Sequence, residues 1–85
     1  MDKTCLIVLG AKYNREEVVA LLNKTQGISH WFYTLPYSIF VNTRLSPKQL
    51  CEIIENTLGK HTLFVTEVTQ NKWGRLNIEL WKSFK

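Results

Sequence analysis

The order of its apolar and amphipathic segments constrains the fold of this chain more than any other feature. Short apolar runs of strand length alternate with two segments in which apolar residues recur every three or four positions, as in a helix. The resulting order is strand, helix, strand, strand, helix, strand. The predicted strands are Thr4–Gly10, Ser29–Thr34, Ser38–Asn42 and Thr62–Val68, and the predicted helices are Arg15–Thr25 and Pro47–Leu58.

Both helix starts carry residues that are typical of helix caps. Ser46 is followed by Pro47 at the first helical position and by Gln49 at the position that completes a capping box. Asn14 is the predicted cap of the first helix, with Glu17 three residues on. A glycine follows each helix and marks its end.

The tail permits two interpretations. Asn77 can cap a short last helix that runs toward the chain end. Alternatively, Leu76, Ile78 and Leu80 alternate with more polar positions as a fifth strand would require. We favour the helix.

The element order predicts an α+β domain of the ferredoxin-like, split βαβ type, spanning residues 1–85 as a single domain. One four-stranded antiparallel sheet would carry two helices on one face, with a short C-terminal helix or strand added. The first and third runs are the most uniformly apolar, which fits central strands. The second and fourth carry His30, Thr34, Thr66 and Glu67, which fits edge strands.

Composition excludes several classes of protein and favours a dimer. With 45% hydrophobic residues and a net charge of +4, the chain is not expected to be disordered. It has no apolar run long enough to span a membrane.

A core built from 85 residues is small, and a sheet with helices on one face leaves the other face bare. Aromatic residues number three Trp, three Tyr and four Phe, so some are expected on that face, where a second copy would cover them. The predicted dimer-interface residues are Trp31, Tyr33 and Trp81. Ordinary packing of Trp31 and Tyr33 is the alternative.

The cysteines and the N-terminus favour a cytoplasmic protein. Cys5 and Cys51 both lie in apolar segments, as buried free thiols do in reducing compartments. The apolar run that follows Met1–Thr4 is short and has no small-residue cleavage site, unlike a signal peptide.

The sequence contains no recognisable enzyme site. Neither His30 nor His61 has a carboxylate or nucleophile placed beside it by sequence, and both are interpreted as surface or partly packed residues. The cysteines and histidines do not have the spacing of a zinc site, and the glycines form no phosphate-binding loop. We therefore predict no catalytic residue, no metal site and no cofactor.

Nucleic-acid binding is the better-supported activity, because basic residues gather in the loops and the tail. Basic side chains neutralise phosphates, and an exposed tryptophan stacks on bases. The predicted nucleic-acid-binding residues are Lys12, Arg15, Arg44, Lys72, Trp73, Arg75 and Lys82.

The segment from His30 to Phe84 also resembles a known family. The similarity lies in His30-Trp31, Leu35, Ser38, Phe40-Val41-Asn42-Thr43, Leu45-Ser46, Leu63 to Thr69, Trp73-Gly74 and Trp81. It is a similarity to the small stand-alone relatives of the CRISPR-associated "Cas-two" proteins, often labelled SinR-like. The resemblance implies a ferredoxin-like fold, dimers and, in the CRISPR-associated branch, nucleic-acid binding and metal-dependent nuclease activity.

One departure from this family separates the chain from its nucleases. The family's acidic metal ligand would fall at the end of the first strand, where residues 9–13 contain Lys12 and no acid. A lysine repels a metal ion, so the nuclease activity is not expected here. The first hypothesis is thus a non-enzymatic, dimeric nucleic-acid-binding protein. The alternative is a protein-interaction module, such as an accessory or inhibitor protein of a mobile element or phage, with a metal-dependent nuclease last.

Overall fold

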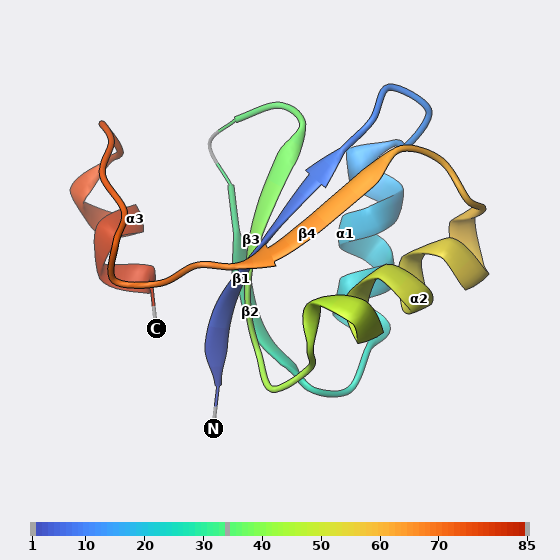
Figure 1. The fold of residues 1–85 in the computed structure, drawn as a ribbon, viewed down its shortest axis with the longest axis horizontal. Helices are drawn as coiled ribbons and strands as arrows, with labels where there is room; N and C mark the ends of the chain where they lie inside the picture. Colours follow the sequence, from blue (N-terminus) through green and yellow to red (C-terminus); the bar gives the residue numbers. More distant parts are fainter. Residues whose placement is uncertain (1, 34, 85) are drawn as a thin grey trace.

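The helices and strands follow the predicted order, and a third helix occupies the tail (Figure 1). The computed structural model describes residues 2–33 and 35–84, so Thr34, placed above in an edge strand, lies outside the described residues. The elements are β1 (Lys3–Leu9), α1 (Arg15–Lys24), β2 (Ile28–Phe32), β3 (Ser38–Thr43), α2 (Pro47–Leu58), β4 (Leu63–Glu67) and α3 (Ile78–Ser83). Of the two interpretations of the tail, the helix is therefore the one observed.

The strands form one four-stranded antiparallel sheet in the order β2-β3-β1-β4. The uniformly apolar β1 and β3 are central, and the more polar β2 and β4 form the edges, as predicted. The register places Ile7 opposite Ile39 in the centre of the sheet and Leu9 opposite Leu63 at one end. The α+β class with a single antiparallel sheet is confirmed.

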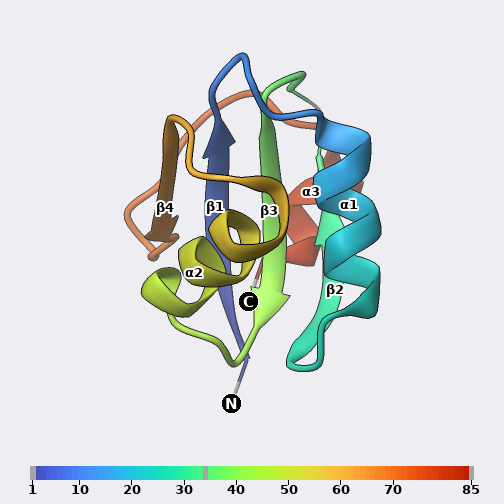
Figure 2. The same cartoon turned by 90° about the vertical axis from the view of Figure 1, so that its right-hand side faces the viewer.

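Helices α1 and α2 cover one face of this sheet (Figure 2). Alternate residues of the two central strands point toward them, and Ile7, Ile39 and Val41 are fully buried there. The helices contribute the other half of the core through Val18, Leu22, Leu50 and Ile54. Each such side chain contributes about 1.5–3 kcal/mol when fully buried.

The predicted caps are present. Asn14 Oδ1 accepts from the Glu17 N–H (3.2 Å), and Ser46 and Gln49 form the reciprocal capping box at 2.8 and 3.1 Å. Helix α1 ends one residue earlier than predicted, because the Thr25 N–H already bonds back to the Leu22 carbonyl at 3.1 Å in an extended conformation.

The tail lies on the sheet face opposite α1 and α2, which corrects the expectation that this face is bare (Figures 1 and 2). The Phe84 ring packs edge-on against Phe32 (5.3 Å) and Phe40 (5.0 Å). The Asn42 side-chain amide donates to the Ser83 carbonyl at 2.9 Å. The tail covers only part of the face, since Phe64 remains 62% exposed.

Among the described residues, no helix has the length and apolar character needed to cross a membrane.

Candidate nucleic-acid interface

The strongest candidate surface is the tail cluster, which we define as Lys72, Trp73, Arg75, Trp81 and Lys82. Trp73 is 95% exposed, the most exposed of the large hydrophobic side chains in the described part of the chain. Its ring lies 6.3 Å from that of Trp81, at an angle of 44°. The two tryptophans line an open hollow together with Gln70, Lys72 and Phe84. A flat, solvated aromatic surface beside cations is what a nucleobase and its phosphate require.

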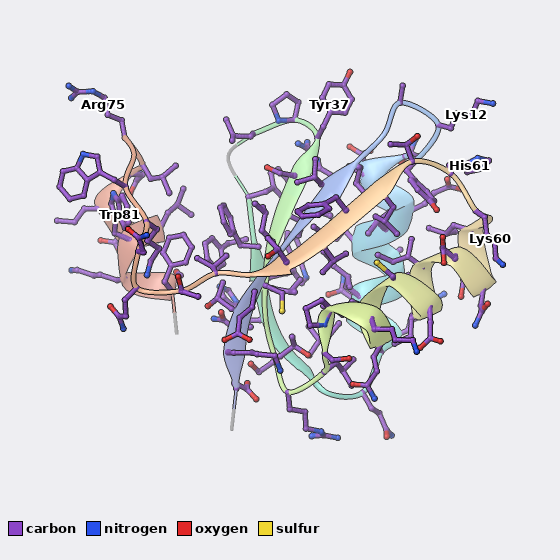
Figure 3. The ribbon with its side chains drawn as sticks, in the orientation of Figure 1. Lys12, Tyr37, Lys60, His61, Arg75 and Trp81 are labelled. Atoms are coloured by element: carbon purple, nitrogen blue, oxygen red, sulfur yellow. The ribbon has the colours of Figure 1, made fainter. Side chains whose placement is uncertain are left out.

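The cations of the tail cluster differ in how firmly they are held. Lys72 Nζ donates to the Thr69 carbonyl at 2.9 Å and lies 5.2 Å above the Phe84 ring, so its charge is fixed beside the hollow. Arg75 and Lys82 are exposed. Figure 3 shows Arg75 pointing outward at the far end of the molecule, with Trp81 nearer the sheet.

Anchoring of the tail explains how a segment with little regular structure can present such a surface. Asn42 is only 2% exposed, accepts from the Thr4 hydroxyl at 2.7 Å and donates to Ser83. Trp81 packs 5.7 Å from Phe84, which is itself held by the aromatic rings of the sheet. The tail cluster is thus supported by a buried polar contact and an aromatic cluster.

The structure does not bring the remaining predicted nucleic-acid-binding residues to the tail cluster. Arg15 is engaged within the chain: its guanidinium lies 3.8 Å from the centre of the Tyr33 ring and donates to the carbonyls of Leu35 and Pro36 at 3.3 and 3.1 Å. Arg44 is exposed at the end of β3, and Lys12 lies at the other end of the molecule from Arg75 (Figure 3).

Two of the three predicted dimer-interface residues are used in the chain's own packing. The Trp31 indole N–H donates to Asn23 Oδ1 of α1 at 2.8 Å, and its ring stacks on Tyr33 at 5.9 Å and 8°. Tyr33 in turn lies beneath Arg15. This corresponds to the packing alternative raised for Trp31 and Tyr33. The third, Trp81, belongs to the tail cluster.

A second surface, not predicted residue by residue, is the uncovered part of the sheet face. We call it the sheet patch and define it as Val8, Leu35, Tyr37 and Phe64. These side chains are 39, 55, 61 and 62% exposed, respectively. Three of them, Val8, Leu35 and Tyr37, line an apolar hollow together with Leu6, Pro36, Ser38 and Phe40.

A third surface contains residues that sequence reasoning did not connect. Lys60 and His61, in the loop between α2 and β4, lie at the same end of the molecule as Lys12, in the loop after β1 (Figure 3). We call Lys12, Lys60 and His61 the loop cluster. The pairing of Leu9 with Leu63 brings the two loops together, so the register of β1 with β4 is the signal that could have revealed this cluster.

Within residues 2–33 and 35–84, no group of three or more His, Cys, Asp or Glu side chains is close enough to hold a metal ion. Burial raises the pKa of the Cys5 thiol, and burial together with Glu55 and Glu52 raises that of Cys51. Both thiols therefore remain protonated at neutral pH and are weak nucleophiles.

Comparison with known proteins does not assign the chain to a family. No protein-family model matches the sequence, and no curated protein is significantly similar to it.

Proposed function

We propose that this protein binds single-stranded nucleic acid without catalysing a reaction, and that the tail cluster is the binding surface. The observation that carries the proposal is the almost complete exposure of Trp73, which shares a hollow with Lys72 and lies in a tail segment that also contains Arg75 and Lys82. A base stacked on an exposed indole contributes about 1–3 kcal/mol. The neighbouring cations would neutralise the phosphates on either side of that base.

The fold and the resemblance to the Cas-two-like group are part of this proposal. With β1 and β3 central and two helices on one face, the strand order β2-β3-β1-β4 supports a ferredoxin-like assignment. The lack of an acid in residues 9–13 is why we propose a diverged member of that group without nuclease activity, and a cytoplasmic location is part of the same proposal.

A pair of substitutions at Trp73 tests the proposal. Because the side chain is exposed, neither Trp73→Ala nor Trp73→Phe should change the thermal unfolding midpoint. Fluorescence anisotropy of a labelled 20-nucleotide single strand should show about 5- to 150-fold weaker binding for Trp73→Ala, the range that 1–3 kcal/mol of stacking gives. Trp73→Phe retains a stacking surface and should recover most of the loss. Unchanged binding by Trp73→Ala would remove the tail cluster from the interface.

Self-association through the sheet patch is a second candidate, and it makes the protein a homodimer. Exposed apolar surfaces of this kind mark interfaces. In addition, the Ser38 hydroxyl, buried beside the sheet patch, has no hydrogen-bond partner among the described residues. A second copy would cover the apolar side chains and could supply that hydrogen bond. A different protein, as expected of an accessory or inhibitor module of a mobile element or phage, is the alternative occupant.

Sedimentation equilibrium distinguishes these outcomes. The wild-type chain should sediment at twice its 10.0 kDa monomer mass at micromolar concentration. Phe64→Glu places a charge in the sheet patch and should give the monomer, whereas Ile78→Glu, at a 68% exposed position on α3, should not. A wild-type monomer at 50–100 µM would contradict the homodimer and leave the sheet patch to another protein.

A further inference from the structure

The loop cluster stands on an unusually well-fixed backbone for two exposed loops. The Gly10 N–H donates to the Thr62 carbonyl at 2.9 Å and joins the loop after β1 to the loop before β4. The hydroxyl of the buried Tyr13 donates to the Gly59 carbonyl at 2.6 Å and accepts from the His61 N–H at 3.1 Å. The relative positions of the loops are therefore set by hydrogen bonds before any ligand binds, which reduces the entropy cost of binding.

The ring of His61 is also positioned by Tyr13. The two rings meet edge to face, with their centroids 5.2 Å apart. The imidazole lies so close to Gly59 that a Cβ at that glycine would be 3.2 Å from Nε2. His61 is thus held at the rim of the hollow between the loops rather than ranging freely in solvent.

The charge around this hollow is uncompensated. Ala11, Lys12, Lys60, His61 and Thr62 line it, and none of them is acidic. Neither lysine makes a salt bridge with any residue in 2–33 or 35–84, and the hollow measures about 530 Å³. A hollow lined by two cations and no acid has a positive potential, which favours an anion there.

We propose that the loop cluster binds a phosphate group, with Lys12 and Lys60 supplying charge and His61 and Thr62 supplying hydrogen-bonding groups. This inference rests on the proposed function, because it assigns the phosphate to the backbone of the nucleic acid whose bases stack at the tail cluster. The loop cluster has no exposed tryptophan, so it contacts phosphate and does not stack on bases.

Strand β4 links the two surfaces. It begins beside His61, and the chain reaches Lys72 soon after β4 ends (Figures 1 and 3). From His61 to Lys72 the chain makes eleven residue-to-residue steps, which span at most about 36–40 Å when fully extended. At about 3.4 Å per nucleotide, ten to twelve nucleotides cover that length. A 20-nucleotide strand therefore reaches both surfaces.

The test compares two double variants that change the net charge equally. Lys12→Gln/Lys60→Gln removes the charge of the loop cluster, and Lys24→Gln/Lys48→Gln removes two exposed lysines from the helices. For single strands, log K falls by about 0.7 per phosphate contact for each decade of salt. Loss of that one phosphate contact should make the salt slope shallower by about 0.7 and weaken binding of the 20-nucleotide strand about 5-fold at 0.1 M salt. The helix variant should weaken it less than threefold, and equal losses from the two double variants would overturn the proposal.

A second measurement separates this proposal from the proposed function. Millimolar inorganic phosphate should shift the backbone amide NMR signals of Lys60, His61 and Thr62 in the wild type and not in Lys12→Gln/Lys60→Gln. Those shifts without any oligonucleotide binding would contradict the proposed function and support the phosphate site. Oligonucleotide binding with unshifted loop signals would support the proposed function and overturn the phosphate site.

Discussion

Removal of one hydroxyl, in Tyr13→Phe, tests whether the two loops at the end of the sheet are joined as described. Tyr13 is only 6% exposed, and its hydroxyl makes two hydrogen bonds, to the Gly59 carbonyl and from the His61 N–H. Each contributes about 1 ± 0.5 kcal/mol, but both backbone partners lie in exposed loops where water can replace part of the loss. We expect a decrease of about 1.5 kcal/mol in the free energy of unfolding.

The decrease is large enough to measure in a domain of 85 residues. A change of 1 kcal/mol shifts the melting temperature of a domain this size by about 4–8 °C, so Tyr13→Phe should melt about 6–12 °C lower. Circular dichroism during heating and urea titration would measure the two quantities. Tyr37→Phe is the matched control, because Tyr37 is 61% exposed and should not change stability. Equal stability of the two variants would refute the hydrogen-bonded connection between the loops.

Three further predictions concern Gly59, the anchoring of the tail by Phe84, and the reactivity of the two cysteines. Gly59→Ala should cost about 1–2 kcal/mol, because Gly59 has φ +94° and faces the His61 ring, whereas Gly74→Ala, with open space around it, should be neutral in urea titration. Phe84→Ala should release the tail from the sheet and increase its cleavage by trypsin at low protease concentration, while the sheet stays folded by circular dichroism. Cys51 should react with a thiol reagent before the fully buried Cys5 in the folded protein, and both should react at once in 6 M guanidinium chloride.

Most of the fold could be predicted because its signals are local. Ser46, Pro47 and Gln49 determine the start of α2 within four residues of chain, and the observed capping box follows directly from them. The apolar character of β1 and β3 gave their central position in the same way.

The docking of the tail could not be predicted, because it depends on contacts between residues that are more than forty positions apart in the sequence. Phe84 packs on Phe32 and Phe40, and Ser83 accepts from Asn42, forty-one residues away. Nothing in the periodicity of the tail indicates which surface it covers, so the sequence pattern alone left the whole sheet face bare.

The candidate site was predicted where its residues are neighbours in sequence and missed where they are not. Lys72, Trp73 and Arg75 lie within four residues of one another, and the structure places Lys72 and Trp73 around one hollow. The contacts of Arg15 with Tyr33 and with the carbonyls of Leu35 and Pro36 could not be predicted, because these residues lie about twenty positions away in the sequence. The loop cluster was missed because its two halves are separated by most of the sequence.

The salt dependence of binding to a single strand tests the central claim most directly. A labelled 20-nucleotide strand would be titrated with the wild-type protein between 50 and 200 mM salt, and log K would be plotted against log salt concentration. Three phosphate contacts at the tail cluster predict a slope of about −2, and the one phosphate at the loop cluster brings it to about −2.8. Absence of binding at 50 mM salt, or a slope near zero, would contradict a nucleic-acid-binding function.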